Sequence, residues 1–172
     1  FHPRCGARIV RYNPAMRWIV LLRDPVERAR SQHHMERERG HEHLPLWLAV
    51  LLERRRLRGH ADDLARGSRL RRCSYRARGD YARQLDTLYA HFPRDQVLLL
   101  RSERLRSDPE ACVREACEFL RVAPPASGAE YEPVFVGDYR PASPGSPGTR
   151  LLRWLMRREL RDMRERYGIE FG

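Results

Sequence analysis

Two side chains that could bind an anion, Arg23 and Ser31, stand eight residues apart after a short apolar run at residues 18–22. The run predicts a strand of a parallel sheet, and Asp24-Pro25 predicts that a helix begins directly after it. Arg23 then lies at the carboxyl end of the strand, where open α/β sheets bind ligands. A guanidinium, a hydroxyl and the N–H groups of a helix N-terminus together make a phosphate receptor. A capped strand-to-helix turn with a solvated arginine explains the same spacing equally well.

The helix predicted after Asp24 has two faces. One stripe at helical spacing contains Val26, Ala29 and His33. The other carries Asp24, Arg28 and Ser31. Glu27, three residues after Asp24, predicts an acidic version of the capping box.

The segment from Leu21 to Ser31 resembles the part of sulfotransferases that binds the 3′-phosphate of 3′-phosphoadenosine 5′-phosphosulfate. The family pattern is a hydrophobic strand, Arg-(Asp/Asn)-Pro, and a serine eight residues after the arginine. The resemblance implies that Arg23 and Ser31 bind this cofactor. It also implies an α/β fold of the P-loop NTPase-like, three-layer type, with a central parallel sheet flanked by helices.

A second stretch is similar to the heparan sulfate type of sulfotransferase domain and its bacterial relatives. The matching segments are Gly79-x-Tyr81-Ala82-x-Gln84-Leu85, Phe92-Pro93-x-x-Gln96-Val97-Leu98, Glu103-x-Leu105-x-x-Asp108-Pro109 and Phe119-Leu120. The resemblance implies that Tyr81 helps to bind the cofactor and that Gln84 contacts the acceptor. The heparan sulfate enzymes have a histidine at the position of Gln84, and glutamine cannot shuttle a proton at neutral pH.

The same stretch predicts structure from its own periodicity. A helix runs from Tyr81 and ends before Pro93, residues 96–100 form a second buried strand, and another helix begins after Asp108. The core face of that last helix is expected to carry Val113, Ala116, Cys117 and Leu120. Strand, helix, strand and helix in this order predict parallel strands in one sheet.

Outside the motifs, an amphipathic helix is expected over 44–57, with a core face of Leu48, Leu51 and Leu52 bordered by Trp47. Residues 60–72 read as a flexible connection. Residues 149–167 predict one amphipathic helix that ends at Gly168. The Pro-, Gly- and Ser-rich residues 124–148 resemble the family region that folds over the cofactor, where Gly137 and Arg140 are the nearest candidates for cofactor contacts.

The composition predicts a globular chain with anionic partners. The 172 residues suit a single domain, with 41% hydrophobic and 33% charged residues and a formal net charge of +11. Every basic residue other than histidine is arginine, so part of the charge reflects coding bias. The four cysteines lack zinc-ligand spacing and read as reduced thiols, and a solvated loop explains His41-Glu42-His43 better than a metal site does. The longest apolar run is too short to span a membrane, and a cytoplasmic location is expected.

The resemblance therefore implies a sulfotransferase that uses 3′-phosphoadenosine 5′-phosphosulfate and releases adenosine 3′,5′-bisphosphate, and no metal is expected. The acceptor is a hydroxyl or amine of a glycan or small molecule, and neither nucleic acid nor membrane is expected as a partner. The chain contains no lysine, so the family's lysine-bearing 5′-phosphosulfate loop is expected upstream of Phe1, and no catalytic residue is assigned. The alternatives are a basic nucleic-acid-binding module and a non-catalytic nucleotide-binding relative.

Overall fold

The computed structural model describes residues 4–60, 63–126, 131 and 145–171. These residues fall into two compact units, and each unit is described separately. The sheet unit contains residues 4–23, 85–126 and 131, and the helical unit contains residues 24–60, 63–84 and 145–171.

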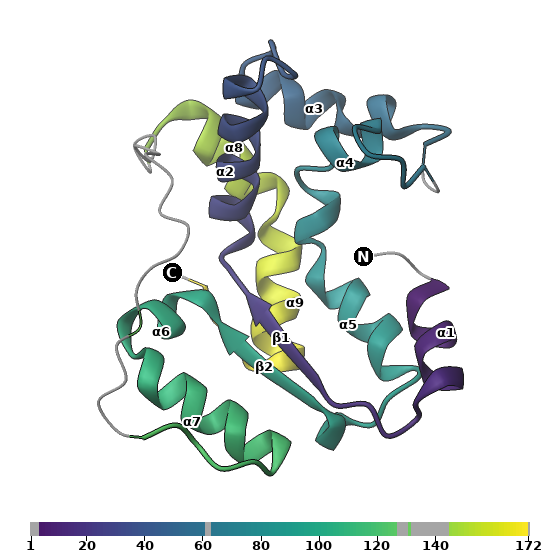
Figure 1. The fold of residues 1–172 in the computed structure, drawn as a ribbon. Helices are drawn as coiled ribbons and strands as arrows, with labels where there is room; N and C mark the ends of the chain where they lie inside the picture. Colours follow the sequence, from purple (N-terminus) through teal and green to yellow (C-terminus); the bar gives the residue numbers. More distant parts are fainter. Residues whose placement is uncertain (1–3, 61–62, 127–130, 132–144, 172) are drawn as a thin grey trace. The chain divides into compact units, whose positions relative to one another are not determined.

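The sheet unit is built on two parallel strands, β1 (Trp18–Leu22) and β2 (Val97–Arg101) (Figure 1). They pair in register from Trp18 opposite Val97 to Leu22 opposite Arg101. The sequence prediction of two parallel strands in one sheet is confirmed, with β2 one residue later than expected.

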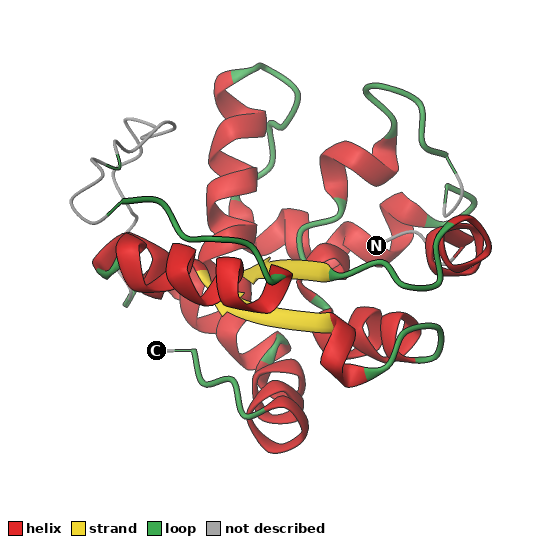
Figure 2. Cartoon of the chain, turned by 60° about the horizontal axis from the view of Figure 1, so that its bottom comes forward, coloured by secondary structure: helices red, strands yellow, loops and turns green. Residues whose placement is uncertain are grey.

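The sheet unit also contains helices: α1 (Arg4–Tyr12), the second half of α5 (Tyr81–Tyr89), the 3₁₀ turn η2 (Arg94–Gln96), α6 (Ser102–Ser107) and α7 (Pro109–Leu120). Figure 2 shows α7 in front of the two strands. Ile19 and Leu21 of β1 are 42% and 50% exposed. The apolar run had suggested that this strand is buried on both faces. Among the described residues, one face of β1 is instead exposed.

Aromatic contacts hold the core of the sheet unit together. Phe92, only 1% exposed, meets the Trp18 ring edge-on at a centroid distance of 5.3 Å. Arg17 donates a hydrogen bond to the Phe119 carbonyl oxygen and lies over the Phe119 ring. Asp108 caps α7 as predicted, by accepting a hydrogen bond from the backbone N–H of Ala111.

The predicted core face of α7 is wrong at its end. Leu120 is 41% exposed, and the buried residue of the helix is Cys112. Cys112 and Phe119 stand seven residues apart and so share one helix face. The Arg17 contacts to Phe119 fix that face toward the strand pair, which leaves Leu120 on the outside.

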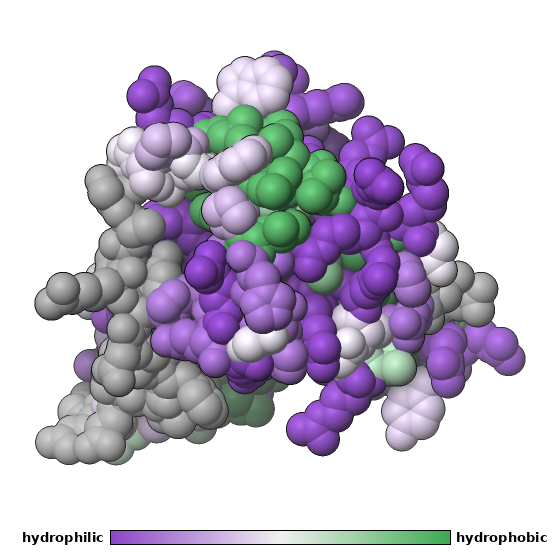
Figure 3. All heavy atoms as spheres, turned by 90° about the horizontal axis from the view of Figure 1, so that it is seen from above, coloured by the Kyte–Doolittle hydropathy of each residue, from purple (hydrophilic) through white to green (hydrophobic). Residues whose placement is uncertain are grey.

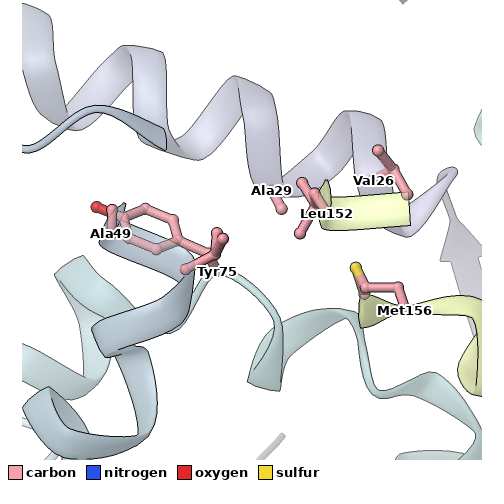
Figure 4. Packing of buried hydrophobic residues seen from close by; sticks show 7 residues of the cluster. Val26, Ala29, Ala49, Tyr75, Leu152 and Met156 are labelled. Carbon is pink, nitrogen blue, oxygen red and sulfur yellow. The ribbon is translucent and has the colours of Figure 1, made fainter. Parts of the chain in front are cut away.

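The helical unit packs α2 (Pro25–Glu38), α3 (Leu46–Leu57), α4 (Arg69–Cys73), the 3₁₀ turn η1 (Ala77–Gly79), α8 (Pro147–Leu155) and α9 (Arg157–Tyr167) together with the start of α5. Its core residues come from four segments, and most are labelled in Figure 4: Val26, Ala29, Ala49, Val50, Tyr75, Leu152 and Met156. A Cβ on Gly79 would lie 2.8 Å from the Met156 Cε and 3.0 Å from the Pro25 Cβ, so a larger residue where η1 meets this core would require both side chains to shift.

Three local predictions for the helical unit are corrected by the structure. On α3 the buried residues are Ala49, Val50 and Glu53, while Leu51 is 49% exposed. The predicted flexible connection contains α4, which begins at the N-cap Ser68. The predicted single C-terminal helix is two helices, α8 and α9, because the helix is interrupted at the buried Met156. Helix α9 ends at Gly168 as predicted, and the φ of Gly168 is +66°.

Among the described residues, no helix is long and apolar enough to cross a lipid bilayer. The same residues contain no group of three or more metal-ligating side chains that could hold a metal ion.

Candidate functional site

Arg23 is the residue between β1 and the N-cap of α2. It is half-buried, and its side chain forms no hydrogen bond or ion pair with any described residue. The carboxylate of the next residue, Asp24, accepts hydrogen bonds from the backbone N–H groups of Val26 (2.7 Å) and Glu27 (3.0 Å). Arg153 of α8 lies 3.8 Å from the other oxygen of Asp24. The guanidinium of Arg23 therefore stays available for an external anion.

The helix start follows the sequence prediction, except for the capping box. Asp24 is the N-cap and Pro25 occupies the first turn. Glu27 does not return to the cap and instead pairs with Arg30, three residues along the helix. The cap is therefore a single carboxylate that holds two N–H groups.

Ser31 lies on α2 between two residues whose side chains are already engaged. Arg28 donates hydrogen bonds to the side-chain oxygen of Gln32 (2.9 Å) and to the backbone carbonyl of Tyr75. Gln32 in turn donates to the carbonyl oxygens of Arg71 and Arg72. The Ser31 hydroxyl is half-buried and has no hydrogen-bond partner among the described residues. On this stretch of α2, Ser31 is thus the polar group free to meet a ligand.

Tyr81 and Gln84 stand at the start of α5. Tyr81 is 8% exposed, and its ring centroid lies 6.2 Å from that of Phe171. The side-chain nitrogen of Gln84 donates to the carbonyl oxygens of Arg78 (3.1 Å) and Asp80 (2.8 Å). Both amide hydrogens of Gln84 therefore have structural partners, and only its side-chain oxygen remains to accept a hydrogen bond from an acceptor molecule.

Two glutamates that sequence reasoning missed hold the segment that leads into α5. Glu53 of α3 accepts hydrogen bonds from the backbone N–H groups of Arg76 and Ala77, both at 2.8 Å. Glu159 of α9 accepts from those of Tyr81 (2.8 Å) and Ala82 (3.0 Å). Glu53 follows Ala49 and Val50 on the buried stripe of α3, which the sequence pattern did not predict.

Burial raises the pKa of Glu159 to about 7, and the neighbouring Asp80 carboxylate adds to this rise. The two backbone N–H groups act in the opposite direction. Because the pKa of the folded state lies above the ordinary 4.5, Glu159 contributes stability that is complete below pH 4.5 and is lost as the pH rises through about 7.

The substitution Glu159→Gln is therefore expected to flatten the pH dependence of stability. The wild-type melting temperature should fall between pH 5 and pH 8 by more than that of the variant, because glutamine accepts the same hydrogen bonds without ionising. Thermal melts at both pH values measure this difference. Glu165→Gln, on the exposed side of the same helix, is the matched control and should follow the wild type. If the melting temperatures of the wild type and Glu159→Gln change with pH in parallel, the Glu159 carboxyl is not the source of the pH dependence.

The remaining candidates, Gly137 and Arg140, lie outside the described residues. Arg23, in the sheet unit, and Ser31, Tyr81 and Gln84, in the helical unit, each have the local setting given above.

A parallel strand pair with an arginine at the carboxyl end of one strand, followed by a capped helix, is the arrangement of α/β proteins that bind phosphate-bearing ligands. A family model described as the sulfotransferase domain matches residues 9–128. The chain belongs to this family.

The structure is similar to the crystal structure of a sulfotransferase from Alicyclobacillus acidocaldarius, with a TM-score of 0.74 and 25% sequence identity. The match covers 99% of this chain and 62% of that one, so the chain spans less than two thirds of the length of this relative. The match confirms the predicted fold class. No curated protein matches the chain.

Proposed function

We propose that the protein transfers a sulfuryl group from 3′-phosphoadenosine 5′-phosphosulfate to a hydroxyl or amine of a glycan or small-molecule acceptor. The observation that carries this proposal is the available guanidinium of Arg23 between β1 and the capped helix α2, inside the residues that match the sulfotransferase domain. The similarity to a bacterial sulfotransferase supports the same reaction class.

In this proposal the donor is held mainly through its 3′-phosphate. Arg23 supplies a charge-assisted and geometrically bidentate contact, and Ser31 supplies a neutral hydrogen bond. Tyr81, Gly137 and Arg140 complete the cofactor contacts, and the side-chain oxygen of Gln84 accepts a hydrogen bond from the acceptor. Sulfuryl transfer also needs a base and cations at the 5′-phosphosulfate. The 172 residues hold no lysine, so the proposal assigns no residue to the 5′-phosphosulfate.

The proposed setting is the cytoplasm, and the proposed reaction needs no metal. Cys73 and Cys112 are buried free thiols, which suits a reducing compartment.

The proposed function predicts a nucleotide preference. The complete protein should bind adenosine 3′,5′-bisphosphate at least about tenfold more tightly than adenosine 5′-phosphate, because the second nucleotide lacks the group that Arg23 and Ser31 contact. Calorimetric titration of both nucleotides at the same salt concentration measures the ratio.

A nucleic-acid-binding module would give a different pattern. It would bind duplex or single-stranded DNA with a steep salt dependence and would show no preference between the two nucleotides. Equal affinities, together with DNA competition, would thus refute the proposal. A non-catalytic relative would share the nucleotide preference, so sulfate transfer from labelled donor to a panel of glycans, phenols and amines is scored separately.

A further inference from the structure

The outward face of α3 carries large apolar side chains that the core of the helical unit does not use. Trp47 is 47% exposed and Leu51 is 49% exposed, and Leu48 beside them is half-buried. The core side of the helix is taken by the small residues Ala49 and Val50. The apolar outward face is therefore extra to what the fold needs.

Cations continue the same face toward the end of the helix. Trp47, Leu51, Arg55 and Arg58 recur at helical spacing, and Arg54 lies beside them; the three arginines are exposed. Arg56, by contrast, is turned toward the interior, where it pairs with Glu42 at 2.5 Å.

The surface formed by residues 40–60 exposes no carboxylate. The stretch contains two acidic residues, Glu42 and Glu53, which are 4% and 3% exposed. Both carboxylates accept hydrogen bonds inside the unit. Glu42 accepts them from Tyr75 and Arg56, and Glu53 accepts them from two backbone N–H groups. What α3 presents to the outside is apolar and positive only.

Seen from the side on which α3 lies in Figure 1, the molecule shows a contiguous apolar patch bordered by hydrophilic residues (Figure 3). A helix face with tryptophan and leucine next to arginines, and without acids, has the chemistry of helices that lie in the interface of an anionic bilayer. Tryptophan suits the headgroup level of such an interface, and arginines gain free energy from anionic lipid phosphates.

We propose that the outward face of α3 binds the surface of an anionic lipid bilayer. Trp47, Leu48 and Leu51 enter the boundary between headgroups and acyl chains, while Arg54 and Arg55 contact lipid phosphates. This surface contact is independent of the proposed reaction. It departs from the sequence-based expectation that a membrane is not a partner, although it is a surface contact and not a membrane span.

Vesicle co-sedimentation of the complete protein tests the proposal. Vesicles of phosphatidylcholine with about 30% phosphatidylglycerol should bind the protein, and vesicles of phosphatidylcholine alone should bind it far more weakly. Raising the salt concentration from about 0.05 to about 0.5 M should weaken the binding, because it screens the arginine contacts. Failure to bind the anionic vesicles at low salt overturns the proposal.

Matched variants locate the contact on α3. Trp47→Ala should lower the partition coefficient about tenfold, because its exposed ring enters the boundary region. Trp154→Ala is the control, since Trp154 of α8 is 57% exposed on another helix, and it should change partition by less than about twofold. The double variant Arg54→Gln/Arg55→Gln should have a partition coefficient that is lower by about fivefold for each arginine removed. Arg150→Gln/Arg161→Gln, which removes two exposed arginines of α8 and α9, should lose less.

Footprinting of the free protein tests whether this face is open. Hydroxyl radicals should oxidise Trp47 readily without vesicles, and anionic vesicles should protect it. Protection without vesicles that does not depend on protein concentration would mean that another segment of the same protein covers α3. Protection that grows with protein concentration would mean that a second copy does. Either result overturns the proposal, as would equal losses for the Trp47 and Trp154 variants.

Discussion

Arg23→Ala in the complete protein is expected to lower the affinity for adenosine 3′,5′-bisphosphate about ten- to a hundredfold. This corresponds to the loss of a charge-assisted contact of roughly 1.5–3 kcal/mol. The structure supports an effect of this size because the Arg23 side chain forms no hydrogen bond or ion pair with any described residue. Calorimetric titration measures both affinities. Ser31→Ala should cost less, because its hydrogen bond is neutral.

Adenosine 5′-phosphate completes the comparison. It lacks the 3′-phosphate, so Arg23→Ala should weaken its binding little. A thermodynamic cycle of the two proteins with the two nucleotides then assigns the loss of affinity to the contact between Arg23 and that phosphate. Because this phosphate is remote from the sulfur, the kinetic loss should appear mainly in the KM for the donor.

Arg101→Ala is the matched control for Arg23→Ala. Arg101 ends β2 opposite Leu22, so its replacement removes the same charge at the carboxyl end of the neighbouring strand. Its effect should be limited to about twofold by long-range electrostatics. If Arg23→Ala weakens both nucleotides equally, Arg23 does not read the 3′-phosphate. If it weakens neither while the melting temperature is unchanged, the capped-turn interpretation holds.

The parts of the fold that local signals specify were predictable from the sequence. The apolar run of β1, the cap at Asp24 and the stop at Gly168 each depend on a few adjacent residues, and the structure has all three. The motif around Arg23 could be found for the same reason. The family resemblance identified the expected ligand, which the residue spacing alone did not determine.

The orientation of α3 could not be read from hydrophobicity. Counting leucines selects Leu48, Leu51 and Leu52 for the core, whereas the helix buries Ala49, Val50 and Glu53. Small side chains let α3 approach the core closely, and Glu53 is buried because two backbone N–H groups need an acceptor there. Those partners are 23 and 24 residues away in sequence, and the partners of Glu159 are 77 and 78 residues away. No periodicity within a single helix encodes contacts of this range.

Glu42 is expected to be the most sensitive position for stability. Its carboxylate accepts hydrogen bonds from the Tyr75 hydroxyl (2.7 Å), from Arg56 (2.5 Å) and from the backbone N–H groups of His43 and Leu44 (both 3.1 Å). Glu42→Ala should lower the free energy of unfolding by about 3–5 kcal/mol, because it leaves a partly buried guanidinium and a buried hydroxyl without their acceptor. Urea unfolding at pH 7 measures the change.

The matched control is Glu115→Ala, which removes the same side chain from an exposed pair with Arg104. It should cost at most about 1 kcal/mol. Tyr75→Phe keeps the ring in the core and removes only the hydroxyl. In a double-mutant cycle with Glu42→Ala, the loss of unfolding free energy in the double variant should be smaller than the sum of the two single losses by about 1–2 kcal/mol.

The pH dependence provides a separate test of Glu42. Burial acts to raise the pKa of Glu42, but the hydrogen bonds from Tyr75 and Arg56 outweigh it, and the pKa in the folded protein lies below the ordinary 4.5. The stabilisation is therefore complete above pH 4.5 and is lost as the pH falls through the lowered value. The wild type should lose stability in acid more steeply than Glu42→Ala, so the difference between the two should shrink as the pH is lowered. A difference that stays constant down to acid pH would mean that the Glu42 charge contributes nothing and that only its packing matters.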